Sequence, residues 1–224
     1  MNALMQPLLL SLKLATVTTI ILFLLAIPLV YFIFFHSQRS KPVFKAVVSM
    51  PLVLPPTVLG YYLLIMLRPE GWLGQLSTAV FDIRLVFSFP GLVIGSLIFS
   101  LPFMVNPILS AIESLPASYQ EAAYTLGKSR WNTLWHVLLP NVKASVIVGL
   151  VMTFAHTIGE FGVILMIGGN IPGETRVASI AIYNEVEMLN FDNADLYASI
   201  LLIFSFLVLL AVYLYQNRRP QQVI

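Results

Sequence analysis

Residues 14–35 read LATVTTIILFLLAIPLVYFIFF, which is a run of 22 positions without a charged side chain. An α-helix rises about 1.5 Å per residue, so roughly 20 apolar residues cross the hydrocarbon core of a bilayer. Three further runs, 46–67, 85–112 and 196–216, also lack Asp, Glu, Lys and Arg, and 144–170 contains one acid, Glu160. The sequence therefore predicts an all-α integral membrane protein with five transmembrane helices, at about 14–35, 46–67, 85–108, 144–168 and 195–216.

The composition excludes the soluble classes of protein. Hydrophobic residues make up 58% of the chain and charged residues 10%, whereas soluble domains average about 25% charged residues. A water-facing surface cannot be built from so few charges, so an ordinary cytosolic enzyme and a disordered chain are both excluded. A net charge of +2 supplies no basic stripe for nucleic acid. The absence of cysteine excludes disulfides, thiolate metal sites and cysteine nucleophiles.

Lysine and arginine predict the orientation, because cytoplasmic loops are enriched in them. One side of the five-span arrangement carries eight of these residues: Arg39, Lys41, Lys45, Lys128, Arg130, Lys143, Arg218 and Arg219. The other side carries four: Lys13, Arg68, Arg84 and Arg176. We therefore expect the N-terminus outside, the C-terminus in the cytoplasm, and the polar segment 111–143 as a cytoplasmic loop.

Two features inside the spans are candidates for a transport pathway. Pro55, Pro56 and Thr57 follow Pro51 in a stretch where prolines remove helix hydrogen bonds and bend the chain. Interrupted backbone persists in a membrane only where protein packs on it or where it lines a cavity. The alternative is a kinked helix that serves only packing.

His156 and Glu160 lie four residues apart, so in a continuous helix they share one face near the membrane midplane. Ionisable groups at this depth are costly and face a cavity or a partner. We expect this face to border the pathway or its gate, and a structural hydrogen bond between helices is the alternative.

The loop 111–143 predicts two short amphipathic helices separated by Gly127. Their apolar faces comprise Leu115, Tyr119, Ala122 and Leu126 in the first helix, and Trp131, Leu134, Trp135 and Leu138 in the second. Such a pair can dock in the groove of a partner protein or lie on the lipid surface.

Enzyme motifs are absent from the sequence. Gly127-Lys128-Ser129 resembles the end of a P-loop, but position 122, where the first glycine belongs, is alanine. The segment from His156 to Glu160 lacks the second histidine of H-E-x-x-H. We therefore expect no enzymatic activity, no cofactor and no metal site.

Residues 121–140 resemble the E-A-A-x3-G-x9-I-x-L-P loop of type I ABC-importer permeases, with Val137 in place of the isoleucine. The resemblance implies that this loop is a coupling helix that sits in a groove of an ATPase subunit. It assigns the following residues to coupling: Glu121, Ala122, Ala123, Gly127, Arg130, Trp131, Leu139 and Pro140.

Other segments resemble the molybdate permeases of this family. Residues 51–64 are similar to their second span, Arg130-Trp131 fits their loop, and 159–162 with 170–176 are similar to their fourth span and the external loop after it. His156 departs from the pattern, since a basic arginine is expected near this position. The resemblance covers residues 8–215 and implies a type I ABC-importer transmembrane domain.

The resemblance also implies function and partners. The chain is expected to be the permease subunit of an ATP-driven molybdate importer in the bacterial inner membrane, working as a homodimer with its pathway at the subunit interface. Two cytoplasmic ATPase subunits and an extracytoplasmic oxyanion-binding protein are the implied partners. A sulfate or tungstate permease with the same mechanism is one alternative. An ion-coupled carrier that uses His156 and Glu160 as a proton relay is another, of a different class.

Overall fold

The computed structural model describes residues 4–36 and 39–217, and every regular element in that part of the chain is a helix. Three helices are long and apolar enough to cross a membrane singly: α1 (Met5–Phe35), α5 (Phe89–Ser114) and α12 (Phe191–Asn217). Two further candidates are bent pairs. Helix α2 (Lys41–Val53) meets α3 (Pro56–Leu67) at 108°, and Arg130–Asn141 meets α9 (Lys143–Gly159) at 82°. The described residues thus contain three to five membrane spans.

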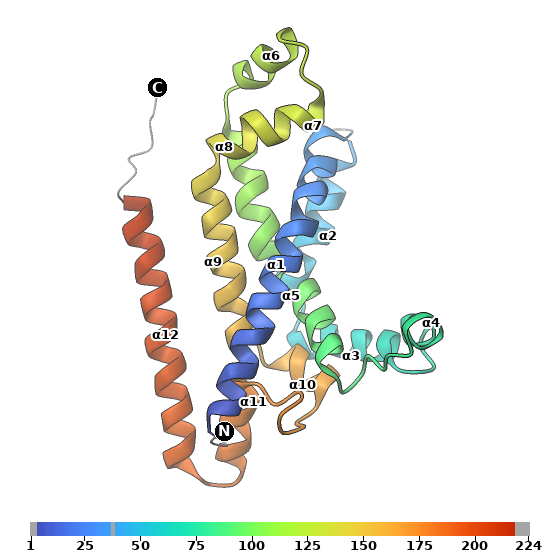
Figure 1. Cartoon of the computed structure of the whole chain (residues 1–224), viewed down its shortest axis with the longest axis vertical. Helices are drawn as coiled ribbons and strands as arrows, with labels where there is room; N and C mark the ends of the chain where they lie inside the picture. The colour runs from blue at the N-terminus through green and yellow to red at the C-terminus, as the bar shows by residue number, and fades with distance from the viewer. Residues whose placement is uncertain (1–3, 37–38, 218–224) are drawn as a thin grey trace.

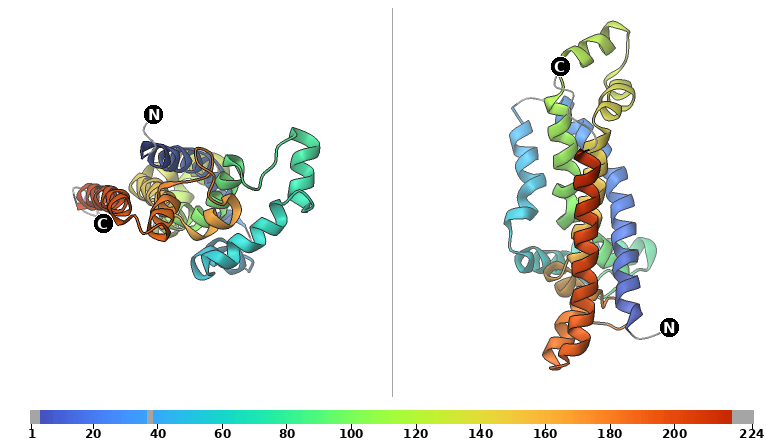
Figure 2. Two further views of the ribbon diagram at one scale, coloured as in Figure 1. Left: turned by 90° about the horizontal axis from the view of Figure 1, so that it is seen from below. Right: turned by 90° about the vertical axis from the view of Figure 1, so that its left-hand side faces the viewer.

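The long helices lie side by side, and the short ones gather at the two ends of the bundle (Figure 1). Helices α6 (Ser118–Thr125), α7 (Arg130–Thr133) and α8 (Leu139–Asn141) lie at one end. Helices α4 (Trp72–Phe81), α10 (Gly162–Gly168) and α11 (Ala178–Glu187) lie toward the other. Figure 2 shows that α1 begins at the α11 end and that α12 finishes toward the α6 end. Arg218 and Arg219, which contribute to the predicted orientation, lie outside the described residues.

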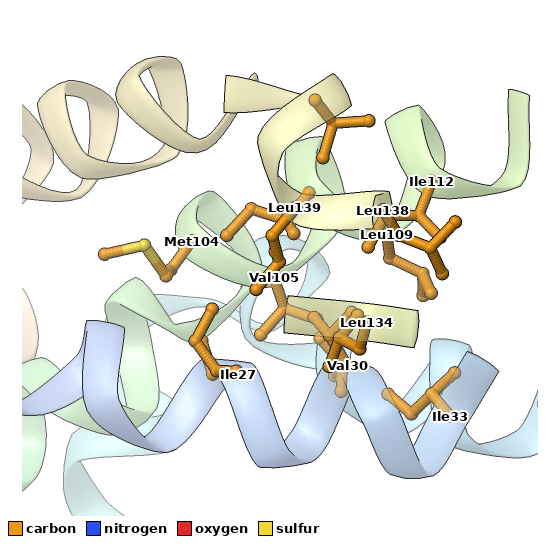
Figure 3. Close-up of a cluster of buried hydrophobic side chains, with 14 of the residues drawn as sticks. Ile27, Val30, Ile33, Met104, Val105, Leu109, Ile112, Leu134, Leu138 and Leu139 are labelled. Atoms are coloured by element: carbon orange, nitrogen blue, oxygen red, sulfur yellow. The ribbon is translucent and has the colours of Figure 1, made fainter. Parts of the chain in front are cut away.

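The largest hydrophobic core joins the bundle to the segment after α7. Figure 3 shows side chains from α1, α5 and residues 134–139 meeting in one cluster. Val30, Ile33, Val105 and Leu134 are all fully buried there. Because protein interiors are close-packed, a displacement of residues 134–139 must be accommodated by α1 and α5.

One predicted span ends at a different residue, and another is bent at its prolines as expected. Helix α5 continues to Ser114, past the predicted end at 108, and accommodates Pro102 and Pro107. Glu113 is therefore part of a helix rather than of the loop. The expected proline bend is present between α2 and α3, where Pro55 and Pro56 supply no N–H to continue the helix.

Candidate coupling surface and membrane-embedded polar cluster

The first half of the predicted loop forms α6 followed by a tight turn. Glu121 and Ala122 are exposed, whereas Ala123 is buried. Gly127 has φ +72°, a left-handed conformation that side chains disfavour. The N–H of Lys128 donates to the carbonyl of Ala123 over 3.0 Å, which closes the helix end in the manner of a Schellman motif. The predicted glycine turn is thus present.

The second half contains α7, a π-helical turn η1 (Leu134–Leu138) and α8. The Ser129 hydroxyl accepts from the N–H of Asn132 and caps α7. In η1 the N–H of Leu139 donates to the carbonyl of Leu134, five residues back, which widens the turn by one residue.

The apolar face predicted for this second half divides into two. Leu134 and Leu138 are fully buried in the core of Figure 3, whereas Trp131 and Trp135 are 42% and 43% exposed. Trp131 packs edge-on against Tyr31 of α1, with 5.0 Å between ring centroids. The two leucines therefore belong to the core, and the two indoles lie at its surface.

The assigned coupling residues therefore have two kinds of environment. Ala123 and Leu139 are buried, and the remaining residues lie on the surface or in the turn: Glu121, Ala122, Gly127, Arg130, Trp131 and Pro140. An open groove of about 460 Å³ runs between α6 and η1, lined by Tyr119, Ala122, Leu126 and Val137, among others. Leu126 is 79% exposed beside it. This is a surface that a partner's apolar side chains can enter.

The second site is a polar cluster on α5, inside the apolar bundle. The Ser96 hydroxyl donates to Glu160 over 2.8 Å, and Ser100, one turn further, lies 3.0 Å from both His156 Nδ1 and the Thr157 hydroxyl. Ser96 and Ser100 are completely buried, and Glu160 is 3% exposed. Sequence reasoning missed both serines, although their spacing of four residues in an otherwise apolar helix was a visible signal.

One geometric expectation was wrong. His156 and Glu160 do not share the face of one helix, because α9 ends at Gly159 and the chain is extended at Glu160 before α10 begins. Two glycines, Gly159 and Gly162, flank the break, and glycine weakens a helix interior. The carbonyl of Glu160 accepts from the Ser179 hydroxyl over 2.6 Å. Both side chains nevertheless contact α5, and the His156 ring stacks on Phe103 at 4.0 Å.

The two interrupted segments lie against each other. A Cβ built on Gly162 would come 2.8 Å from Cβ of Pro56, and one on Gly60 would come 2.8 Å from Cβ of Met166. The chain break at Glu160 and the bend at Pro55 are therefore neighbours in space. Pro55, Pro56 and Thr57 are exposed. Within residues 4–36 and 39–217, no group of three or more His, Asp and Glu side chains is placed to hold a metal ion.

Comparison with known proteins identifies the family. Residues 15–221 match the family described as the inner membrane component of binding-protein-dependent transport systems. The chain belongs to this family. Its apolar helices are accordingly those of a multi-pass inner-membrane transport component.

Relatives of this transport component include two named permeases. It is 43% identical over 210 residues to the molybdenum transport system permease protein ModB of Azotobacter vinelandii, covering 94% of this chain and 92% of the relative. It is 33% identical over 181 residues to the probable sulfate transport system permease protein cysT of Zygnema circumcarinatum, covering 80% of this chain and 62% of the relative.

A solved structure has the same fold. It is a chain of a bacterial alginate ABC transporter in complex with an alginate pentasaccharide-bound periplasmic protein, with a TM-score of 0.77 and 18% identity. The match covers 97% of this chain and 80% of the other. The helices of this chain are therefore arranged as in that chain of an ABC transporter.

Proposed function

We propose that this chain is the permease subunit of an ATP-driven importer and forms the membrane pathway for molybdate. The observation that carries the proposal is the E-A-A loop, which is folded as an exposed helix-turn-helix at one end of a membrane bundle. The choice of molybdate is supported by 43% identity to a molybdenum permease, against 33% to a probable sulfate permease. Sulfate and tungstate are the alternative substrates.

The coupling role is assigned to the exposed part of the loop. Helix α6 lies beyond the end of the bundle, farther from the spans than α7 and α8 (Figure 1), which favours docking into a protein groove over lying on lipid. Glu121, Ala122 and Arg130 meet the ATPase subunit at this surface, and Gly127 holds the turn between its two halves. Ala123 and Leu139, which are buried, connect the surface to the bundle. The partner hydrolyses ATP, and this chain has no ATPase site of its own.

The assembly contains two copies of this chain, two ATPase subunits and an extracytoplasmic oxyanion-binding protein, with the pathway between the two copies. The exposed residues Pro55, Pro56 and Thr57 lie beside that pathway. A carboxylate repels an oxyanion, so Glu160, together with His156, which also contacts α5, shapes the gate rather than holding the substrate.

Five membrane crossings are proposed, with the N-terminus outside and the C-terminus in the cytoplasm. The positive-inside rule supports this orientation, because Lys41, Lys45, Lys128 and Lys143 all lie on segments at the α6 end. A reporter active only in the cytoplasm should be on when fused after Ile224 and off when inserted near Gly74 or Asn190. Activity at Asn190 would contradict five crossings.

The function is tested in proteoliposomes that contain the permease and its ATPase, supplied with the binding protein. ATP supplied on the side of the membrane where the ATPase is bound should drive transport of radiolabelled molybdate from the side of the binding protein. Tungstate and sulfate are tested as competitors. Uptake of sulfate without molybdate would select the alternative substrate. Uptake driven by an ion gradient without the ATPase would instead identify an ion-coupled carrier.

A further inference from the structure

A seam of polar contacts joins α2 to α5 along one face of each helix. Lys41, Lys45 and Ser49 recur every four residues on α2 and therefore share a face. The two lysines bind the two carboxylate oxygens of Glu113, at 2.7 and 2.6 Å. Further along, the side-chain amide of Asn106 donates to the Ser49 hydroxyl over 3.1 Å.

Among these contacts, those of Glu113 lie nearest to the coupling surface. It lies in the last turn of α5, which ends at Ser114, immediately before the segment that leads to α6. The side chains of Lys41 and Glu113 are 15% and 24% exposed, so water screens their attraction less than it screens a surface pair. The start of α2 is thus attached to the end of α5 that leads to the coupling surface by two ion pairs, of which the one from Lys45 is also a charge-assisted hydrogen bond.

The other end of the segment is attached to a different part of the molecule. Beyond the 108° bend, α3 packs on α10 through the close approaches of Gly60 to Met166 and Gly162 to Pro56. Only Leu54 and Pro55 connect α2 to α3. Pro55 and Pro56 have no N–H to bond back to α2, so the backbone hydrogen bonds hold Leu54 to α2 and Pro55 to α3 separately. The proline rings fix φ at residues 55 and 56, so the angle between the two helices can change only through the ψ angles of Leu54 and Pro55.

We call α2, residues 41–53, the lever, and we call Leu54–Pro55, which connect it to α3, its hinge. We propose that Glu113 is a positioning residue for transport: through Lys41 and Lys45 it makes α2 move with α5 and the coupling surface, and the segment pivots at Leu54–Pro55. A shift of the coupling surface then changes the angle between α2 and α3, beside the exposed residues Pro55–Thr57. This inference rests on the proposed function, because it assumes that an ATPase moves the coupling surface.

Removing the carboxylate separates the lever from the coupling surface. Glu113→Gln loses both ion pairs and leaves two cations four residues apart on α2, which repel each other. In the reconstituted complex, anion transported per ATP hydrolysed should fall roughly fivefold or more, the scale of a typical coupling free energy. The amount of ATPase that co-purifies should stay unchanged, because Glu113 is not on the docking surface. Inverting the charges, with Glu113→Lys, Lys41→Glu and Lys45→Glu together, should restore most of the native ratio of anion transported to ATP hydrolysed.

A disulfide provides a test that does not depend on weakening the fold. The chain contains no cysteine, so Ser49→Cys with Asn106→Cys introduces a single pair where the native side chains touch. Oxidation should leave transport within about twofold of the reduced protein, because the lever already moves with α5. Loss of transport on oxidation that reverses with reductant would overturn the proposal, since it would mean that α2 must slide along α5.

The controls separate this proposal from the function on which it rests. If the native complex imports sulfate instead of molybdate, the same ratios are measured with sulfate, and only the substrate assignment is lost. If the native complex is active and Glu113→Gln keeps the native ratio, the lever is refuted while the permease assignment stands.

Discussion

Replacing Gly127 with valine tests whether the coupling surface depends on the shape of its turn. A Cβ at this position meets no atom within 4 Å, but φ is +72°. The expected cost is therefore conformational and not steric, about 1–2 kcal/mol for a side chain held in the left-handed region. If docking requires the native turn, this corresponds to roughly 5–30-fold weaker binding of the ATPase, at about 1.4 kcal/mol per tenfold.

The assay is a titration of purified ATPase subunit against the permease in lipid nanodiscs, with molybdate uptake measured in parallel. Gly127→Asn is the matched control, because asparagine tolerates the left-handed region while adding a side chain of similar size. We expect Asn to bind nearly as glycine does and Val to bind weakly, with normal membrane insertion of both. Native affinity of the valine variant, or equal weakness of both variants, would refute the argument from backbone angle.

Three further pairs of substitutions test packing and polar contacts. Gly60→Val should separate α3 from α10 and lower stability by about 1–3 kcal/mol, measured as thermal inactivation in detergent. Gly159→Ala is the control, because the added Cβ meets open space, and it should not lower stability. Equal inactivation temperatures of the two variants would contradict this packing. Glu160→Leu leaves the buried Ser96 hydroxyl without its acceptor and should cost about 1–3 kcal/mol, while Glu160→Gln keeps an acceptor and should be milder by the same measurement. Leu138→Ala should cost about 2–5 kcal/mol as a core cavity, whereas Trp131→Ala, at an exposed residue assigned to coupling, should reduce uptake with less loss of stability. The reverse pattern would contradict this division between core and surface.

The parts of the fold that could be predicted are those set by local sequence. Long apolar runs indicate where spans lie, and Gly127 within an amphipathic pattern indicates a turn. The end of α5 was not predictable in this way, because the helix continues to Ser114 through a region where Glu113 binds two lysines some 70 residues earlier in the chain, at 41 and 45.

The contacts of the polar cluster around Glu160 also could not be predicted from local sequence. Glu160 stands in a run that reads as a continuous helix, and the contacts that hold it outside the helix come from Ser96 and Ser179. Neither serine carries a local signal that names its partner. Periodicity alone also could not separate Leu134 from Trp131, because both fall on the apolar face of the pattern and only the packing against α1 and α5 distinguishes them.

The π turn at Leu134–Leu138 has a consequence for how this segment tolerates changes in length. Its extra residue brings Leu134, Leu138 and Leu139 into the core together, which a regular α-helix would not do for residues five apart. Deleting one residue here would rotate everything that follows by about 100° and withdraw it by about 1.5 Å, so that Leu139 and the start of α9 would lose their register with α5. A one-residue insertion or deletion between residues 134 and 139 should therefore be rejected.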